Sequence, residues 1–311
     1  MPVIDMAAAP FERRGSDAPL GAFESVFLGD AGGLTQFGVI FATLEPGAAS
    51  SDRHWHEVED EFLWVIGGAA VLADERGETL LRPGDAVAWK AGVPNGHHIL
   101  NRGDDPVRFL VAGWRSPEDV VHYPDLGRRA WHAPDGSRQT EPERLERAAP
   151  ATLPDPVLDL AALPVRTGSI YPEPYAAMMK GRSSLRLGAA GGLTRFGANL
   201  VRLEPGALSS LRHWHAREDE FAMVTDGICT LIDDAGAHAM RPGDCAAFPA
   251  GDGNGHHFVN RTDSPAAFLV LGARMDPERA VYSDLDLVLD VRSGEVSYTL
   301  KDGSPYPGAG R

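Results

Sequence analysis

Cysteine, long apolar stretches and net positive charge are all scarce in this sequence. Its 311 residues include only Cys229 and Cys245. Two cysteines cannot form a disulfide framework, which fits a reducing compartment. There is no stretch of about 18 apolar residues to cross a membrane and no signal peptide at the start, so we expect a cytoplasmic protein without membrane partners. A net charge of −15 repels phosphate backbones and argues against a nucleic-acid partner.

Long amphipathic helices are also missing, and turn residues are abundant. The 35 glycines and 24 prolines favour many short strands joined by turns. Short apolar or alternating runs, such as FLWVIGGAAVLAD and VRFLVAGW, recur every ~8–12 residues between turn segments such as EPGA and RPGD. This pattern predicts an all-β sandwich or barrel. Helix is expected only at Pro117–Val121 and as a single turn in the connector described next.

The sequence contains an internal duplication. LGDAGGLTQFGVIFATLE begins at Leu28, and LGAAGGLTRFGANLVRLE begins 159 residues later, at Leu187. The same offset holds over about a hundred residues without insertion or deletion, which indicates a repeat of one structural unit. We therefore predict an N-terminal barrel over residues 1–132, a Pro-rich extended connector over 133–165 and a C-terminal barrel over 166–311.

Each copy carries the same four candidate metal ligands. In the first copy, His54 and His56 lie two residues apart and face the same side of a strand. Glu61 can return on the neighbouring strand, and His97 must come from another part of the barrel. A single His-x-His pair is most often structural, but here the whole set recurs at matched spacing as His213, His215, Glu220 and His256. Three imidazoles and one carboxylate suit a divalent first-row metal and leave two positions for water or substrate.

These residues resemble the two motifs of the cupin superfamily. The motif positions in this chain are Gly47, His54, His56, Glu61, Gly68, Gly84, Asp85, Gly92, His97 and Asn101, then Gly206, His213, His215, Glu220, Gly227, Gly243, Asp244, Pro249, Gly251, His256 and Asn260. The resemblance implies an all-β fold of two double-stranded β-helix (jelly-roll) cupin barrels in tandem. It also implies a divalent metal in each barrel: manganese, iron, nickel or zinc.

The second motif departs from the usual cupin pattern. Lys90 replaces the usual proline, and the segment before the motif histidine is two residues longer than usual. In both copies, the histidine of this second motif is followed directly by another histidine. Counting back from the motif asparagine favours His97 and His256 as ligands, and leaves His98 and His257 as residues behind the ligands or on the surface.

Several other positions leave alternatives open. Tyr123 and Tyr282 recur after each barrel and could act as general acids, although packing on the barrel is the favoured interpretation. Asn199 replaces Ile40 and either contacts a substrate in one barrel or lies on the surface. Both cysteines match alanines of the first copy, which suggests small core residues.

The two pockets are expected to differ in shape. Leu63 and Trp64 of the first copy become Ala222 and Met223 in the second. Two metal sites of unlike shape could treat one substrate differently.

The resemblance is to uncharacterised bacterial cupins of the cupin-2 type and names no substrate. The intact ligand sets favour a metal-dependent enzyme acting on a small organic acid or sugar-like molecule, as a dioxygenase, decarboxylase, isomerase or lyase. The alternative is a non-enzymatic sensor or storage module that holds a metal or small ligand. The chain is expected to be a monomer with two pseudo-twofold barrels or a homodimer.

Overall fold

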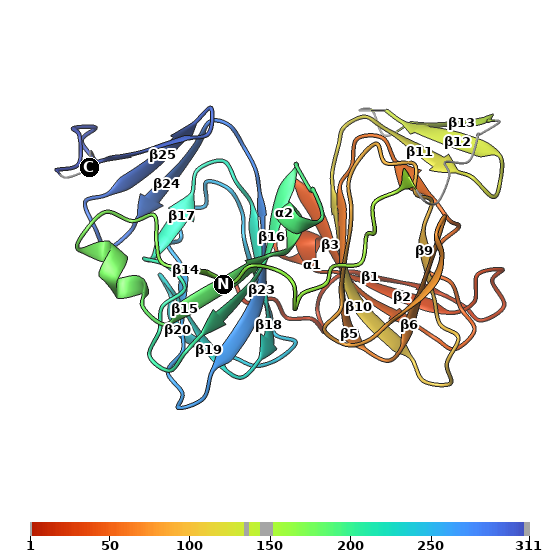
Figure 1. The fold of residues 1–311 in the computed structure, drawn as a ribbon, viewed down its shortest axis with the longest axis horizontal. Coiled ribbons are helices and arrows are strands. Elements are labelled where there is room, and N and C mark those ends of the chain that lie inside the picture. Colours follow the sequence, from red (N-terminus) through yellow and green to blue (C-terminus); the bar gives the residue numbers. More distant parts are fainter. Residues whose placement is uncertain (1, 134–136, 144–151, 308–311) are drawn as a thin grey trace.

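The computed structural model describes residues 2–133, 137–143 and 152–307, and it consists of two β-barrels side by side (Figure 1). Barrel one is formed by the following elements: β1 (Phe11–Arg14), β2 (Phe23–Phe27), α1 (Leu28–Ala31), β3 (Phe37–Leu44), β4 (Trp55–His56), β5 (Glu61–Gly67), β6 (Ala70–Asp74), β7 (Gly77–Leu81), β8 (Ala86–Trp89), β9 (His98–Leu100), β10 (Val107–Trp114), β11 (Asp119–Tyr123), β12 (Arg128–His132) and β13 (Arg138–Pro142).

Barrel two repeats this order, with one additional 3-10 helix. Its elements are β14 (Arg166–Thr167), η2 (Tyr175–Met179), β15 (Arg182–Arg186), α2 (Leu187–Ala190), β16 (Phe196–Leu203), β17 (His213–His215), β18 (Glu220–Asp226), β19 (Cys229–Asp233), β20 (Gly236–Met240), β21 (Cys245–Phe248), β22 (His257–Val259), β23 (Ala266–Ala273), β24 (Glu278–Tyr282), β25 (Val288–Arg292) and β26 (Glu295–Thr299).

Each barrel is made of three antiparallel sheets in the same arrangement. In barrel one the strand orders are β1-β2-β3-β10-β5-β8, β7-β6-β9 and β13-β12-β11-β4. In barrel two they are β14-β15-β16-β23-β18-β21, β20-β19-β22 and β17-β24-β25-β26. Non-consecutive strands therefore lie side by side, as in a jelly roll. The predicted all-β fold of two tandem jelly-roll barrels is confirmed.

Two local expectations differ from the structure. The helix expected at Pro117–Val121 is wrong, because β11 begins at Asp119 and pairs with both β12 and β4. Within the predicted connector, residues 138–142 form β13 and pair with β12. The helical turn expected in the connector falls largely on residues 144–151, outside the described residues. The domain boundaries stay a prediction.

A continuous apolar core joins the two barrels. The inner faces of the sheets enclose one core in each barrel, while the outer faces of the two six-stranded sheets pack against each other. At this seam Phe37 stacks on Phe196 with ring centroids 5.7 Å apart, and both side chains are fully buried. Trp64 and Met223 also belong to the seam. The expectation that they shape the pockets is therefore wrong.

The short helices α1 and α2 approach the opposite barrel closely at this seam. A Cβ atom on Gly32 would lie 2.2 Å from the Cβ of Ala247, and one on Gly191 would lie 2.2 Å from the Cβ of Ala88. No larger side chain fits without moving a strand. The repeated Gly-Gly segment therefore has a packing role in both copies.

The segment that leads into each repeat pairs with the sheet of the other repeat. Near the N-terminus, the Ile4 amide donates to the Cys245 carbonyl (2.9 Å), so residues 2–4 lie along β21 of barrel two. Before barrel two, the Leu158 amide donates to the Ala86 carbonyl (3.0 Å), so residues 156–158 lie along β8 of barrel one. This exchange covers the edge strands β21 and β8, so their backbone groups are paired and not left open to another chain.

Two buried aspartates make a further connection between the barrels. Asp60 accepts hydrogen bonds from the backbone amides of Thr194 and Arg195, which belong to barrel two. Asp219 accepts the equivalent bonds from Thr35 (2.6 Å) and Gln36 (2.9 Å) of barrel one. The two barrels are thus held in one relative orientation.

Candidate metal centres

The four predicted ligands of each half meet at one end of their barrel. His56 lies on β4, Glu61 is the first residue of β5, and His97 directly precedes β9. The backbones of His54 and His97 hydrogen-bond to each other in both directions, which places both imidazoles side by side. In barrel two, β17, the start of β18 and the residue before β22 provide His213, His215, Glu220 and His256 in the same way.

In barrel one the ligand atoms surround a small space. The Nε2 atom of His97 lies 2.9 Å from Oε2 of Glu61, and the Nε2 atom of His56 lies 3.8 Å from the same oxygen. The ring of His54 completes the group, with its centroid 5.1 Å from that of His56 and 5.4 Å from that of His97. Ligand atoms of His54, His56 and Glu61 all lie within 4.8 Å of one another.

Barrel two has the same arrangement with slightly different distances. The Nε2 atoms of His213 and His215 are 3.1 Å apart. The Nε2 atom of His256 lies 3.3 Å from Oε1 of Glu220, and that of His215 lies 3.6 Å from Oε2. Two imidazole nitrogens and a carboxylate facing one point form a donor set that suits a divalent cation.

Backbone carbonyls fix the orientation of most of the imidazoles. In barrel one, Nδ1 of His54 donates to the Asp52 carbonyl and Nδ1 of His97 donates to the Asn95 carbonyl, both over 2.9 Å. In barrel two, Nδ1 of His213 donates to the Leu211 carbonyl over 2.8 Å. A proton on Nδ1 leaves the lone pair on Nε2, the atom that points to the centre. The rings are therefore oriented as metal ligands require.

A buried carboxylate lies beside the remaining imidazole in each barrel, within hydrogen-bond distance of Nδ1 in His56. Oδ2 of Asp119 lies 2.6 Å from Nδ1 of His56, and Oε1 of Glu278 lies 3.4 Å from Nδ1 of His215. Both carboxylates are buried. Sequence reasoning missed Asp119 and Glu278. Both are acidic and lie at equivalent positions of the repeat, and this signal could have identified them.

Burial and neighbouring charges together set the pKa values of the candidate ligands. It lowers the pKa of His54 to about 4 and that of His213 to about 3, and the neighbouring imidazoles add to this effect. Burial acts to raise the pKa of Glu220, but the three imidazoles outweigh it and hold this pKa at about 2. Neutral imidazoles and an ionised carboxylate are the forms that bind a divalent metal. Burial also acts to lower the pKa of His56 and of His215, but the carboxylates around them outweigh it and raise both, to about 9 for His56, so these two imidazoles would release a proton when a metal binds. The donor set of each centre fits such an ion.

A second glutamate borders each centre. Burial raises the pKa of Glu59 and of Glu218 to about 7. Oε2 of Glu59 lies 3.9 Å from Nδ1 of His56, and Oε2 of Glu218 lies 3.7 Å from Nδ1 of His215. Sequence reasoning missed these residues too, although they recur at the repeat offset.

The additional histidines and the tyrosines have other partners. Nδ1 of His98 donates to the Ser51 carbonyl, and Nδ1 of His257 to the Ser210 carbonyl, each over 2.9 Å. Tyr282 is buried in an aromatic cluster, as the packing interpretation expects. The Tyr123 hydroxyl accepts a hydrogen bond from Arg138 at 2.9 Å.

A cavity of about 440 Å³ opens onto the centre of barrel two. His213, Glu220 and His256 lie in its wall, together with Asn199 and Glu218. Asn199 thus faces the cavity, and its contact with a substrate stays a prediction.

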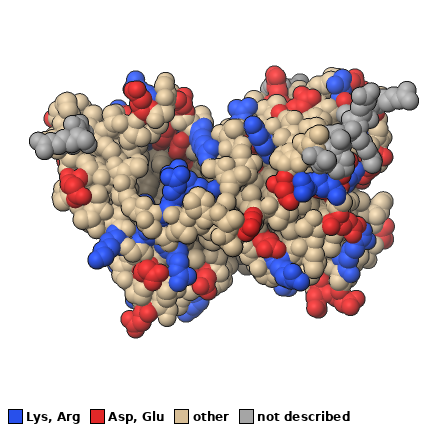
Figure 2. Space-filling model, viewed as in Figure 1, with Lys and Arg blue, Asp and Glu red and all other residues tan. Residues whose placement is uncertain are grey.

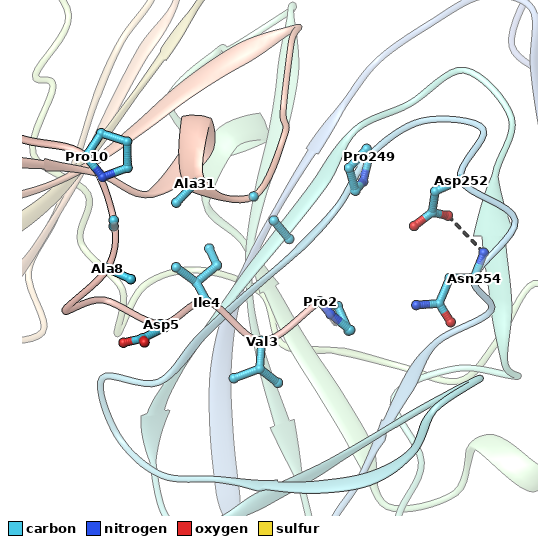
Figure 3. A pocket seen from close by; sticks show the side chains of 13 residues that line it. Pro2, Val3, Ile4, Asp5, Ala8, Pro10, Ala31, Pro249, Asp252 and Asn254 are labelled. Atoms are coloured by element: carbon cyan, nitrogen blue, oxygen red, sulfur yellow. Dashed lines mark hydrogen bonds between the residues drawn. The ribbon is translucent and has the colours of Figure 1, made fainter.

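A separate cavity of about 400 Å³ lies where the N-terminal segment crosses to barrel two, with Pro2, Val3, Ile4, Pro249 and Asn254 among its lining residues (Figure 3). None of the eight candidate ligands lines it. Among the described residues, no helix is long and apolar enough to cross a membrane.

Comparisons with known proteins agree with this arrangement. The Cupin domain family matches residues 40–113 and 199–272. Oxalate decarboxylase from Bacillus subtilis is 18% identical, with a TM-score of 0.53, over 91% of this chain and 78% of that chain. Oxalate decarboxylase from Lactobacillus farciminis is 16% identical, with a TM-score of 0.55, over 91% and 88%. These two similarities concern the fold.

A smaller protein matches with higher sequence identity. A sugar phosphate isomerase from a cupin superfamily, from Silicibacter pomeroyi, is 59% identical over 49% of this chain and 99% of that chain, with a TM-score of 0.48. A comparison with curated proteins gives no match.

Proposed function

Because the chain belongs to the cupin superfamily as a bicupin, we propose that it is a metal-dependent enzyme acting on a small organic acid or sugar-like molecule. The reaction would be of the oxygenase, decarboxylase, isomerase or lyase type. The observation that carries the proposal is the convergence of three imidazoles and one carboxylate in each barrel, with a cavity beside the second set. Such a centre with open positions supports catalysis as well as binding.

The ligand sets would be His54, His56, Glu61 and His97 in barrel one, and His213, His215, Glu220 and His256 in barrel two. The ion would be manganese, iron, nickel or zinc. When bound, it would supply a Lewis acid that polarises a substrate oxygen.

The chain's own residues contribute orientation and exclusion of water. Trp89 stacks on His97 with ring centroids 3.9 Å apart, and Phe248 stacks on His256 at 3.5 Å. These aromatic rings cover one face of the last ligand in each barrel. Together with the carbonyls that accept from Nδ1, they restrict the direction of His97 and His256.

Metal content of matched variants tests the proposal. Wild-type protein should hold about two equivalents of one divalent metal, one for each ligand set, as measured by elemental mass spectrometry. The double variant His54→Ala/His56→Ala should lose one equivalent and His213→Ala/His215→Ala the other. His238→Ala is the matched control, because His238 pairs with Asp233 away from both centres.

Two outcomes would contradict the proposal. One is wild-type protein that stays free of metal after reconstitution. The other is turnover of an identified substrate that survives in the protein lacking both ligand pairs. Ligand-induced thermal stabilisation without any turnover would instead indicate a binding module.

A further inference from the structure

The cavity wall of barrel two differs in charge from the same positions in barrel one. Strand β15 directs Arg182, Ser184 and Arg186 towards the cavity. At the repeat offset, β2 has Phe23, Ser25 and Phe27. Arg186 therefore has an aromatic counterpart, whereas the Arg14 guanidinium of barrel one donates to the Ser50 carbonyl as Arg182 does to the equivalent Ser209 carbonyl.

The neighbouring strand adds a polar group at the same level. Arg186 pairs with Asn199 of β16 across the sheet, and both residues line the cavity. In barrel one the equivalent pair is Phe27 with Ile40. Directly opposite residues on one sheet face have Cβ atoms close enough for both side chains to contact one ligand.

A third arginine is present in both barrels, but it is neutralised only in barrel one. Arg115 forms an ion pair with Asp30 of α1. Its counterpart Arg274 lines the cavity of barrel two, and the residue equivalent to Asp30 is Ala189, which lines the same cavity. Loss of that carboxylate leaves the charge of Arg274 available to a ligand.

None of the three cavity arginines forms an ion pair with another described residue. Arg182 is held by the carbonyls of Ser209 (2.7 Å) and Gly168 (2.9 Å), and Arg274 by that of Leu193 (2.8 Å). Such bonds orient a guanidinium without neutralising it. Figure 2 shows basic side chains gathered beside a hollow on the barrel-two side of this face.

We propose that barrel two binds the oxyanion group, carboxylate or phosphate, of a small anionic substrate through Arg186, Arg274 and Asn199, next to its metal centre. Barrel one lacks this subsite and takes a different, less charged ligand. The proposal rests on the proposed function, because the anionic group is placed beside the metal-bound part of the same molecule. Guanidinium groups recognise carboxylate and phosphate by paired hydrogen bonds.

The charge balance of the cavity agrees with this assignment. Glu218 and Glu220 also lie in its wall and would repel an anion on their own. Glu220 is turned to the imidazoles, at 3.3 Å from Nε2 of His256. The three arginines, together with the divalent ion, outweigh the two carboxylates. In barrel one, Phe27 and Ile40 stand in place of Arg186 and Asn199, and Arg115 is paired with Asp30.

Calorimetric titration of the metal-loaded full-length protein tests the subsite, with malonate and inorganic phosphate as separate probes. One equivalent of the preferred anion should bind per chain. Arg186→Gln should weaken this binding about tenfold or more, because a charge-assisted bond is lost. Asn199→Ile, which installs the residue of barrel one, should also weaken it. Arg202→Gln is the matched control, since Arg202 on the same sheet pairs with Glu204 at 3.2 Å.

The outcomes separate this proposal from the one on which it rests. Metal retained in Arg186→Gln, with anion affinity reduced and the preferred probe identified, supports the subsite. Metal present but affinity for both probes unchanged in Arg186→Gln and Asn199→Ile overturns the subsite and leaves the metal centres intact. Two equivalents of anion per chain also overturn it, because both barrels would then bind alike. Absence of metal from the wild-type protein overturns the proposed function instead.

Discussion

Replacing Asp60 by alanine should weaken the connection between the two barrels. The Asp60 side chain is fully buried and accepts three backbone hydrogen bonds. One comes from Ala91 in its own barrel (2.9 Å), and the others come from Thr194 and Arg195 across the seam. The variant would remove all three acceptor contacts at once.

The loss can be estimated from these bonds. A hydrogen bond to a charged group contributes about 1.5–3 kcal/mol, so three at the lower limit amount to about 4.5 kcal/mol. We use the lower limit because Thr194 and Arg195 are exposed residues, and water can replace part of the loss. Asp219→Ala should have an effect of similar size, because its contacts are equivalent.

Urea unfolding followed by circular dichroism measures this effect. The midpoint for Asp60→Ala should fall by about 1–2 M, given a slope of about 3 kcal/mol per M for a protein of this size. Asp263→Ala, at an exposed position, is the control and should leave the midpoint unchanged. A midpoint for Asp60→Ala equal to that of the control would refute the reasoning, since the aspartate would then contribute nothing to the seam.

Two further predictions concern the metal centres and the thiols. Asp119→Asn should lower the metal affinity of barrel one by about 10–100-fold in chelator competition, because the carboxylate that orients His56 is weakened; an unchanged affinity would exclude that role. Burial raises the pKa of Cys229 to about 12 and that of Cys245 further, so both thiols stay neutral at pH 8. A disulfide reagent should therefore label neither in the native protein and both after denaturation; rapid labelling of either in the native state would contradict their burial.

The eight candidate ligands were predictable because their pattern is local and occurs twice. Strand alternation alone places His54 and His56 on one side. The repeat then shows that the set His54, His56, Glu61 and His97 is retained as a whole. The structure brings these residues together as expected, and the same holds for barrel two.

The residues that support the ligands were not predictable from local pattern. Asp119 contacts His56 only because β11 pairs with β4. Trp64, by contrast, was assigned to a pocket, but it faces the seam. Side-chain direction along β5 alternates between the inside of the barrel and the other barrel, and only the packing of the two sheets decides which face is which.

By itself, the sequence determined the class of fold, the duplication and the two sets of candidate ligands, because turn spacing, strand alternation and the repeat offset are all properties of the chain. Only the tertiary structure decided how the two copies combine. The exchange of residues 2–4 and 156–158, the stack of Phe37 on Phe196 and the cavity wall formed by Arg186 and Asn199 join segments that are distant in the chain or pair across strands. Such contacts depend on which surfaces meet when apolar faces are buried, and a sequence pattern does not specify that pairing.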